Sequence, residues 1–280
     1  MRRWISNGLM ALVALAMTGF SGASLAQSYF LYAKSLGAYP DLQFPAVAKE
    51  LGIFSSTSNG IFKPQGEGPF PAVVLVHTCG GLQAHMTARA KDLLAAGYLV
   101  LVLDAYGPRN HTAFCTAGGV QAPRVYKDAF DALKHLSSMA VVDAARIYLV
   151  GLSLGSFAAS SAASPNVAQA VGATQRFRAS VGWYGSCEFD VNPYPKWTLV
   201  HPDTDKPLLL LMARKDSETP IDSCFPFLDN LKAQGKPVSW HVYEGATHGW
   251  DKSIPNRGYV YSADTTQDAM RRTLEFLKNN

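Results

Sequence analysis

The sequence predicts an α/β fold in which helices cover both faces of a mostly parallel sheet. Two observations lead to this prediction. In several short apolar runs, such as residues 71–77 and 207–213, apolar and polar residues do not alternate as they do in a strand with one solvent-exposed face. Such runs are typical of strands that are buried on both faces. Longer stretches with helical character separate these runs, as the crossover connections of parallel strands require.

The expected elements follow one another in order along the chain. Residues 60–64 (Gly-Ile-Phe-Lys-Pro) end at a proline, which predicts an early edge strand, and the glycine-rich residues 65–69 predict a turn. Short, mostly apolar runs predict buried strands at residues 71–77, 98–104, 146–152, 177–184, 207–213 and 238–243. Longer stretches predict helices at residues 84–96, 122–138, from 153 onward, 220–233 and, with amphipathic spacing, 263–278.

The first 26 residues have the parts of a secretory signal peptide. Arg2 and Arg3 precede an apolar run, and Ser24 and Ala26 supply small residues at the −3 and −1 positions of a cleavage site. The apolar run is shorter than the roughly 20 residues that span a membrane. We expect cleavage after Ala26, a periplasmic or secreted protein and no membrane attachment after cleavage. No repeat or linker divides residues 27–280, so we expect a single domain.

Composition excludes several classes of partner. Hydrophobic residues make up 48% and charged residues 16% of the chain, which is typical of a globular protein with a sizeable core. The net charge of +4 is slight and no basic run occurs, so nucleic-acid binding is not expected. The spacing of the cysteines does not indicate a zinc site, and the sequence contains no His-Glu-x-x-His motif. We therefore expect no metal and no cofactor.

A Gly-x-Ser-x-Gly motif around Ser153 is the central feature of the sequence. It follows an apolar strand and precedes a small-residue helix, so a sharp turn would lift the serine above the sheet edge. Gly151 and Gly155 are expected where backbone approaches backbone. Ser153 is therefore the candidate nucleophile; the alternative is an ordinary turn with a helix-capping serine.

The candidate acid and base come from the ends of the next strands. Asp216 follows the strand at 207–213 and His248 follows the last strand, which reproduces the order Ser, acid, His of α/β-hydrolases. His248 would act as general base and Asp216 would orient it. Other side chains could take these roles: Asp222, Glu218 and Glu188 as the acid, and His77, His85 and His111 as the base.

Two backbone N–H groups are expected to form an oxyanion hole. The glycine-rich loop at residues 78–81 follows the strand that ends at His77 and can turn N–H groups inward. We favour the N–H groups of Cys79 and Leu154. The alternative interpretation of the loop is a plain turn.

From about residue 71 to the C-terminus the chain resembles the dienelactone hydrolase family of α/β-hydrolases. The resemblance rests on residues 77–81, 104–109, 151–155, Asp216 before Thr219-Pro220, and 243–250. It implies an α/β-hydrolase fold and hydrolysis of a small-molecule ester or lactone. The namesake enzymes carry a cysteine nucleophile, so a serine at position 153 favours ordinary esters.

Several side chains near the expected site are candidates to line the substrate pocket, although core packing or a structural ion pair would explain each of them equally well. They are Tyr106, Arg109, Trp183, Tyr184 and Trp250. Arg109 could hold a substrate carboxylate.

The four cysteines of an exported chain predict two disulfides, for which three pairings exist. In an α/β-hydrolase sheet the strands before Cys79 and Cys115 are neighbours, and so are the strands before Cys187 and Cys224. We therefore expect the pairs Cys79–Cys115 and Cys187–Cys224; four buried thiols are the alternative.

These features together predict an exported serine hydrolase that cleaves carboxylic esters or lactones through an acyl-enzyme. A peptidase of the prolyl-oligopeptidase type shares the fold and the order of the catalytic residues, but it usually carries a large additional domain. A non-catalytic binding protein on the same scaffold would be expected to lack one of the three residues. The sequence does not predict the oligomeric state.

Overall fold

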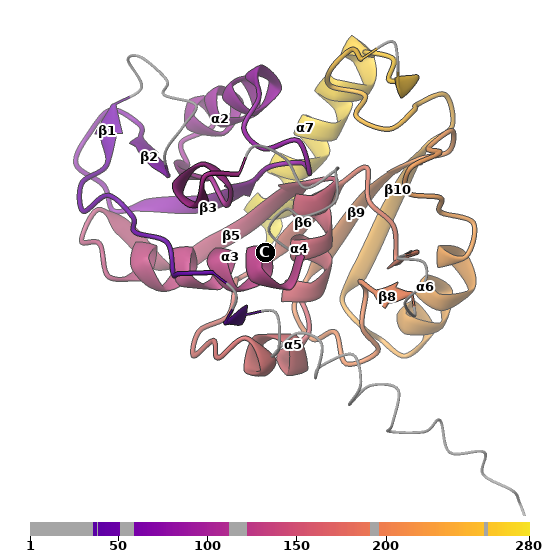
Figure 1. Cartoon of the computed structure of the whole chain (residues 1–280), viewed down its shortest axis with the longest axis horizontal. Coiled ribbons are helices and arrows are strands. Elements are labelled where there is room, and N and C mark those ends of the chain that lie inside the picture. The colour runs from indigo at the N-terminus through magenta and orange to yellow at the C-terminus, as the bar shows by residue number, and fades with distance from the viewer. Residues whose placement is uncertain (1–35, 38, 51–58, 112–121, 191–195, 255–256) are drawn as a thin grey trace, which may run out of the picture.

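A computed structural model describes residues 36–37, 39–50, 59–111, 122–190, 196–254 and 257–280. Its central sheet contains eight strands: Lys49–Glu50 (β1), Gly60–Lys63 (β2), Phe70–Val76 (β3), Leu99–Leu103 (β4), Val142–Leu152 (β5), Ser180–Trp183 (β6), Leu208–Ala213 (β9) and Val238–Tyr243 (β10). They lie in the order β1-β2-β4-β3-β5-β6-β9-β10 (Figure 1). The strands from β4 to β10 in this order are parallel, and only the β2–β4 pair is antiparallel. The predicted α/β fold with a mostly parallel sheet is confirmed.

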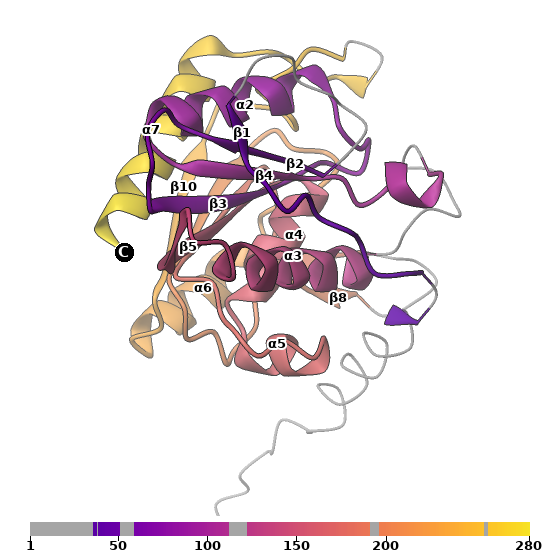
Figure 2. The same ribbon diagram turned by 90° about the vertical axis from the view of Figure 1, so that its left-hand side faces the viewer.

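Helices cover both faces of the sheet (Figure 2). One face carries the helices Ala84–Ala95 (α2) and Ala263–Asn279 (α7). The other carries Ala122–Ser137 (α3), Leu154–Ala162 (α4), Pro165–Ala170 (α5) and Cys224–Ala233 (α6). A short 3₁₀ turn at Gly107–Arg109 (η1) follows β4, and a two-stranded ribbon pairs Glu188–Phe189 (β7) with Trp197–Thr198 (β8).

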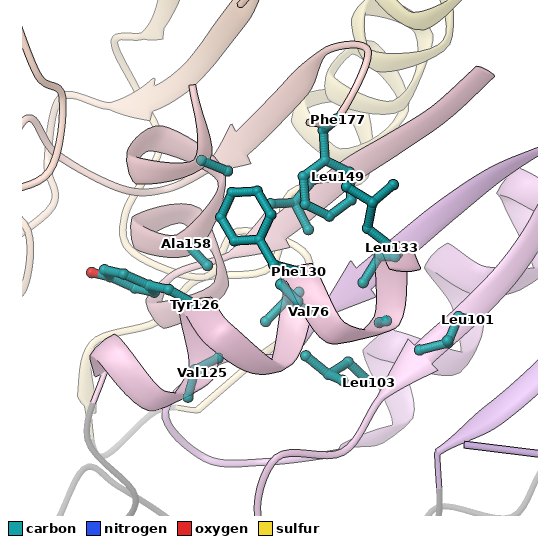
Figure 3. Close-up of a cluster of buried hydrophobic side chains, with 14 of the residues drawn as sticks. Val76, Leu101, Leu103, Val125, Tyr126, Phe130, Leu133, Leu149, Ala158 and Phe177 are labelled. Carbon is teal, nitrogen blue, oxygen red and sulfur yellow. The ribbon is translucent and has the colours of Figure 1, made fainter. Parts of the chain in front are cut away.

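The two-sided core follows from the alternation of side chains along each strand. In β3, Val74 and Val76 pack towards α3 and α4, whereas Val73 and Leu75 pack towards α2 and α7, and all four are fully buried. Figure 3 shows part of the first cluster, in which Phe130 of α3 faces the sheet close to Phe177 (ring centroids 5.5 Å apart). Burial of each such side chain stabilises the fold by about 1.5–3 kcal/mol. The packed core therefore holds the ends of the strands in defined positions.

The structure corrects some of the expected boundaries. The strand β2 is not at the edge, because β1 pairs with its outer side. Helix α6 begins at Cys224 rather than at residue 220, because residues 217–223 form bends and turns that follow the strand end. Helix α5 and the β7–β8 ribbon are too short to show a periodic pattern, and the sequence did not predict them.

The predicted signal peptide at residues 1–26 lies outside the described residues, as does Cys115. Within the described ranges, no helix combines the length and the apolar character that a membrane crossing would need.

Candidate active site

The candidate site lies where the parallel strands end. The strand β5 runs directly into Ser153, β9 leads to Asp216 and β10 leads to His248. Because parallel strands place their carboxyl ends at one edge of the sheet, three residues far apart in the sequence come together there.

The turn at Ser153 is a sharp strand-to-helix elbow. Ser153 has φ 54° and ψ −110°, a backbone conformation that non-glycine residues rarely adopt. A Cβ atom on Gly151 would overlap the carbonyl of Gly155, and one on Gly155 would overlap the carbonyl of Val76. Two hydrogen bonds fix the elbow: Ser153 N–H donates to the Trp183 carbonyl (3.0 Å) and Gly155 N–H donates to the His77 carbonyl (3.1 Å).

The side chains of Ser153, His248 and Asp216 form one hydrogen-bonded chain. His248 Nδ1 lies 2.7 Å from Asp216 Oδ2, and His248 Nε2 lies 2.9 Å from Ser153 Oγ. All three residues are buried. An ionised carboxylate only accepts hydrogen bonds, so Nδ1 carries the proton and the free lone pair of Nε2 faces the serine hydroxyl. This arrangement is able to withdraw a proton from Ser153.

Asp216 is held by the loop that follows it. Its Oδ1 accepts the backbone N–H groups of Glu218 (2.9 Å) and Thr219 (2.8 Å), and its Oδ2 accepts the Thr219 hydroxyl (2.8 Å). These donors hold the carboxylate in place and orient Oδ2 towards His248. Sequence reasoning did not assign a role to Thr219, although an aspartate whose side chain caps the next N–H groups is a common turn signal.

The loop after β3 lies on the other side of Ser153. Thr78 closes a tight turn by accepting the N–H of Gly81 (3.0 Å). His77 Nε2 accepts the N–H of Ala105 (3.1 Å), so its Nδ1 carries the proton and donates to the Thr78 carbonyl (2.6 Å). Burial lowers the pKa of His77 and keeps it neutral in this role. The ring thus anchors the loop that contains Cys79 and does not face Ser153.

A pocket of about 420 Å³ opens onto Ser153. The residues that line it include both expected oxyanion donors and several that the sequence did not assign to the pocket: Cys79, Ser153, Leu154, Phe157, Phe189, Glu218, Thr219 and Arg257. Phe157 and Phe189 pack against each other with ring centroids 5.0 Å apart. The pocket is therefore mainly apolar, with one charged wall.

None of the five side chains predicted to line the pocket does so. Trp183, Tyr184 and Trp250 are fully buried and form an aromatic stack behind His248, in which the Tyr184 and His248 ring centroids are 5.2 Å apart. The Tyr184 hydroxyl donates to the buried Asp251 (3.0 Å), and burial raises the pKa of both groups. Through Tyr184, these buried aromatic residues pack against the His248 ring on the side of the core and support its position.

The predictions for Arg109 and Tyr106 are also wrong. The Arg109 guanidinium makes a two-pronged ion pair with the buried Asp128 (2.6 and 2.8 Å) and also donates to the carbonyls of Pro40 and Ala105. It is therefore a structural arginine with no donor left for a substrate. Tyr106 is buried in the core against His77, with ring centroids 4.5 Å apart.

The other candidate acids and bases lie elsewhere or in other roles. Asp222 and Glu188 form surface ion pairs with Arg214 and Lys196. His85 is buried on α2, where desolvation lowers its pKa to about 3, and His111 packs against Tyr39. Glu218 lines the pocket but does not contact His248 Nδ1. Arg257, Phe157 and Phe189 also line the pocket. No sequence pattern predicted that these three residues would lie there.

A disulfide joins two loops that border the pocket. Cys187 and Cys224 are bonded, with Cα atoms 5.4 Å apart, as the sequence predicted. Cys187 lies two residues before Phe189, and Cys224 begins α6 just after the Asp216 loop. Cys79 is disulfide-bonded as well, but its predicted partner Cys115 lies outside the described residues. Among the described residues, no group of three or more potential metal ligands is present.

Known proteins share this architecture and sequence pattern. The model of the dienelactone hydrolase family matches residues 59–280. The chain is 26% identical over 227 residues to a "Probable 2-oxo-3-(5-oxofuran-2-ylidene)propanoate lactonase" from a Bradyrhizobium species, covering 77% of this chain and 86% of that protein. It is 25% identical over 273 residues to a "Putative carboxymethylenebutenolidase" of Escherichia coli K12, covering 91% and 97%. The butyrate-bound esterase Est2 of Thermogutta terrifontis has the same fold, with a TM-score of 0.57, 17% identity and coverage of 79% and 88%.

We predict that the Cys187–Cys224 bond contributes strongly to stability. The residues it joins are 37 positions apart, and chain entropy assigns a crosslink over such a loop about 4 kcal/mol. A double Cys187→Ser, Cys224→Ser variant should lose free energy of unfolding of this order in urea titrations. Under strong reductant the wild type lacks the bond too, so the difference should vanish. A gap that persists under reductant would mean that the serines themselves cause the loss.

Proposed function

Since the chain belongs to the dienelactone hydrolase family, we propose that it is a serine hydrolase that cleaves carboxylic esters or lactones through an acyl-enzyme on Ser153. The observation that carries this proposal is the buried chain of hydrogen bonds from Ser153 Oγ to His248 Nε2 (2.9 Å) and from Nδ1 to Asp216 Oδ2 (2.7 Å). In this chain the Ser153 hydroxyl lies next to the imidazole that can act as its base, and the Asp216 carboxylate orients that imidazole.

In the proposed reaction, Ser153 Oγ attacks the carbonyl carbon while His248 Nε2 takes its proton. The Asp216 carboxylate stabilises the imidazolium that forms. The negative charge on the carbonyl oxygen requires donors, and the N–H of Leu154 is well suited because the first residue of a helix has no intrahelical partner. The N–H of Cys79, a residue that lines the same pocket, is proposed as the second donor. His248 then returns the proton to the leaving oxygen, and water deacylates Ser153 in the same way.

The pocket also bears on the substrate. A volume of about 420 Å³ with Leu154, Phe157 and Phe189 in its lining suits a small apolar acyl or alcohol group rather than a polymer. The two relatives are named for lactone hydrolysis. We propose that small esters are preferred and that lactones are also accepted.

We propose further that residues 1–26 direct export and are then removed. The charged, apolar and small-residue segments of this stretch support the proposal. An oxidising compartment would also keep the Cys187–Cys224 disulfide formed.

The nucleophile is tested by Ser153→Ala. We expect kcat on p-nitrophenyl esters to fall by on the order of 10⁴-fold or more and labelling by a fluorophosphonate probe to be lost. The matched control is Ser156→Ala on the same helix, where the buried hydroxyl has no hydrogen-bond partner among the described residues. This variant should stay within a few-fold of the wild type. If Ser153→Ala kept several per cent of the wild-type kcat, the nucleophile would have to be another residue.

The support of Asp216 by Thr219 is tested by Thr219→Val, which removes the hydroxyl bond to Oδ2 but keeps the side-chain volume. A hydrogen bond to a charged group is worth about 1.5–3 kcal/mol, so we expect kcat to fall by about tenfold with little change in KM. Thr219→Ser keeps the hydroxyl and should restore most of the activity. Should Thr219→Ser prove more damaging than Thr219→Val, packing in the pocket rather than the hydrogen bond would be the role of this residue.

Export is tested by expression of the full chain in a bacterial host with a periplasm. The mature protein should be recovered from the periplasmic fraction with Gln27 as its first residue, as determined by N-terminal sequencing. Recovery of uncleaved protein from the cytoplasm would contradict the proposal.

A further inference from the structure

A second carboxylate stands beside the catalytic end of His248. Glu218 Oε2 lies 3.7 Å from His248 Nε2, the nitrogen that faces Ser153. Asp216 already occupies the opposite nitrogen of the ring. The proposed triad is therefore complete without Glu218. The side chain of Glu218 is one third exposed and lines the pocket.

Two contacts hold Glu218 near His248, one through its backbone and one through its carboxylate. Its own backbone N–H donates to Asp216 Oδ1 (2.9 Å), which ties the residue to the triad. Arg257 Nη1 lies 3.6 Å from Oε1, the oxygen other than the one that approaches the histidine. Burial and the adjacent Glu218 carboxylate raise the pKa of the Tyr259 hydroxyl, whose ring packs against His248 at 5.1 Å. Of the two charged groups, the Glu218 carboxylate is the one that approaches His248 Nε2, while Arg257 also lines the pocket.

The described lining of the pocket carries one negative and one positive side chain. Apart from Glu218 and Arg257, the described lining residues are uncharged. The nearest further cation is Lys252, which lies 5.5 Å from the centroid of the Tyr259 ring, binds Gln83 Oε1 (3.2 Å) and does not line the pocket. Because the Glu218 side chain is one third exposed, solvent and salt screen its charge in part.

From this geometry we infer that Glu218 determines substrate specificity by selecting against negative charge on the alcohol part of the ester and favouring neutral or cationic alcohols. The inference rests on the proposed function, because it requires His248 Nε2 to deliver a proton to the leaving oxygen. The leaving oxygen must then lie next to Nε2, and the alcohol group next to Glu218. A negative charge there is repelled and a positive charge is attracted.

The inference assigns the effect to one step. Esters that share an acyl group but differ in the alcohol form the same acyl-enzyme on Ser153. Deacylation is then identical for all of them, and charge on the alcohol acts only on kcat/KM for acylation. Opposite effects on anionic and cationic alcohols separate Glu218 from a residue that merely shapes the pocket.

The experiment uses phenyl acetate, 4-carboxyphenyl acetate and 4-(trimethylammonio)phenyl acetate with the full mature chain. For each variant, kcat/KM of the charged esters is divided by that of phenyl acetate. In Glu218→Gln we expect this ratio to rise by about fivefold or more for the carboxylate ester and to fall by a similar factor for the cationic ester, because the variant loses the repulsion of the first and the attraction of the second. Arg257→Gln should shift both ratios in the opposite direction.

The matched control is Glu244→Gln, which removes a carboxylate at the end of β10 that is paired with Arg214 on the surface. Its ratios should equal those of the wild type. In 0.5 M salt the effects of Glu218→Gln should shrink, because the pocket is open to solvent at this wall.

The outcomes separate this inference from the proposed function. If the wild type hydrolyses all three esters in a manner that depends on Ser153, but the ratios in Glu218→Gln stay within twofold of wild type, the role of Glu218 is refuted and the proposed function stands. If the wild type hydrolyses none of the esters and no fluorophosphonate label is found on Ser153, the proposed function fails and the inference fails with it.

Discussion

The backbone at Ser153 is the constraint on which the rest of the site depends. A non-glycine residue at positive φ is strained, and it persists only where the surrounding structure holds it. Here the strand β5 enters the elbow between β3 and β6, whose carbonyls at His77 and Trp183 accept the N–H groups on either side of Leu154. Leu154 itself begins the helix, so its N–H has no partner within the helix.

The buried layer behind His248 gives the histidine its rigidity. Tyr184 and Tyr259 pack edge-on against the imidazole, with ring centroids 5.2 and 5.1 Å away. Trp250 and Trp183 extend this contact into the core under α7. The aromatic residues are therefore structural, and they leave the imidazole little freedom except at the face that meets Ser153.

Two loops beside the pocket are held together by covalent and polar links. The Cys187–Cys224 bond and the hydrogen bond from Ser186 Oγ to the Pro220 carbonyl (2.6 Å) join the loop before Phe189 to the loop after Asp216. Because Glu218 and Thr219 belong to that second loop, the same links hold the charged side of the pocket and the residue that supports Asp216.

The sequence by itself determined the strands and helices of the central layers, and with them the order of the triad candidates. Their signal is local: uninterrupted apolar runs at 71–77 and 207–213, the two glycines around Ser153, and a polar residue at each strand end. Cys187 and Cys224 could be paired because the order of neighbouring strands follows from the fold. Tertiary structure alone decided which side chains face the pocket. Arg109 turns towards Asp128, Trp183 and Trp250 turn into the core, and Arg257 reaches the pocket from a loop with no sequence pattern. Side-chain direction at a loop or strand end depends on partners distant in the sequence, and no local periodicity records them.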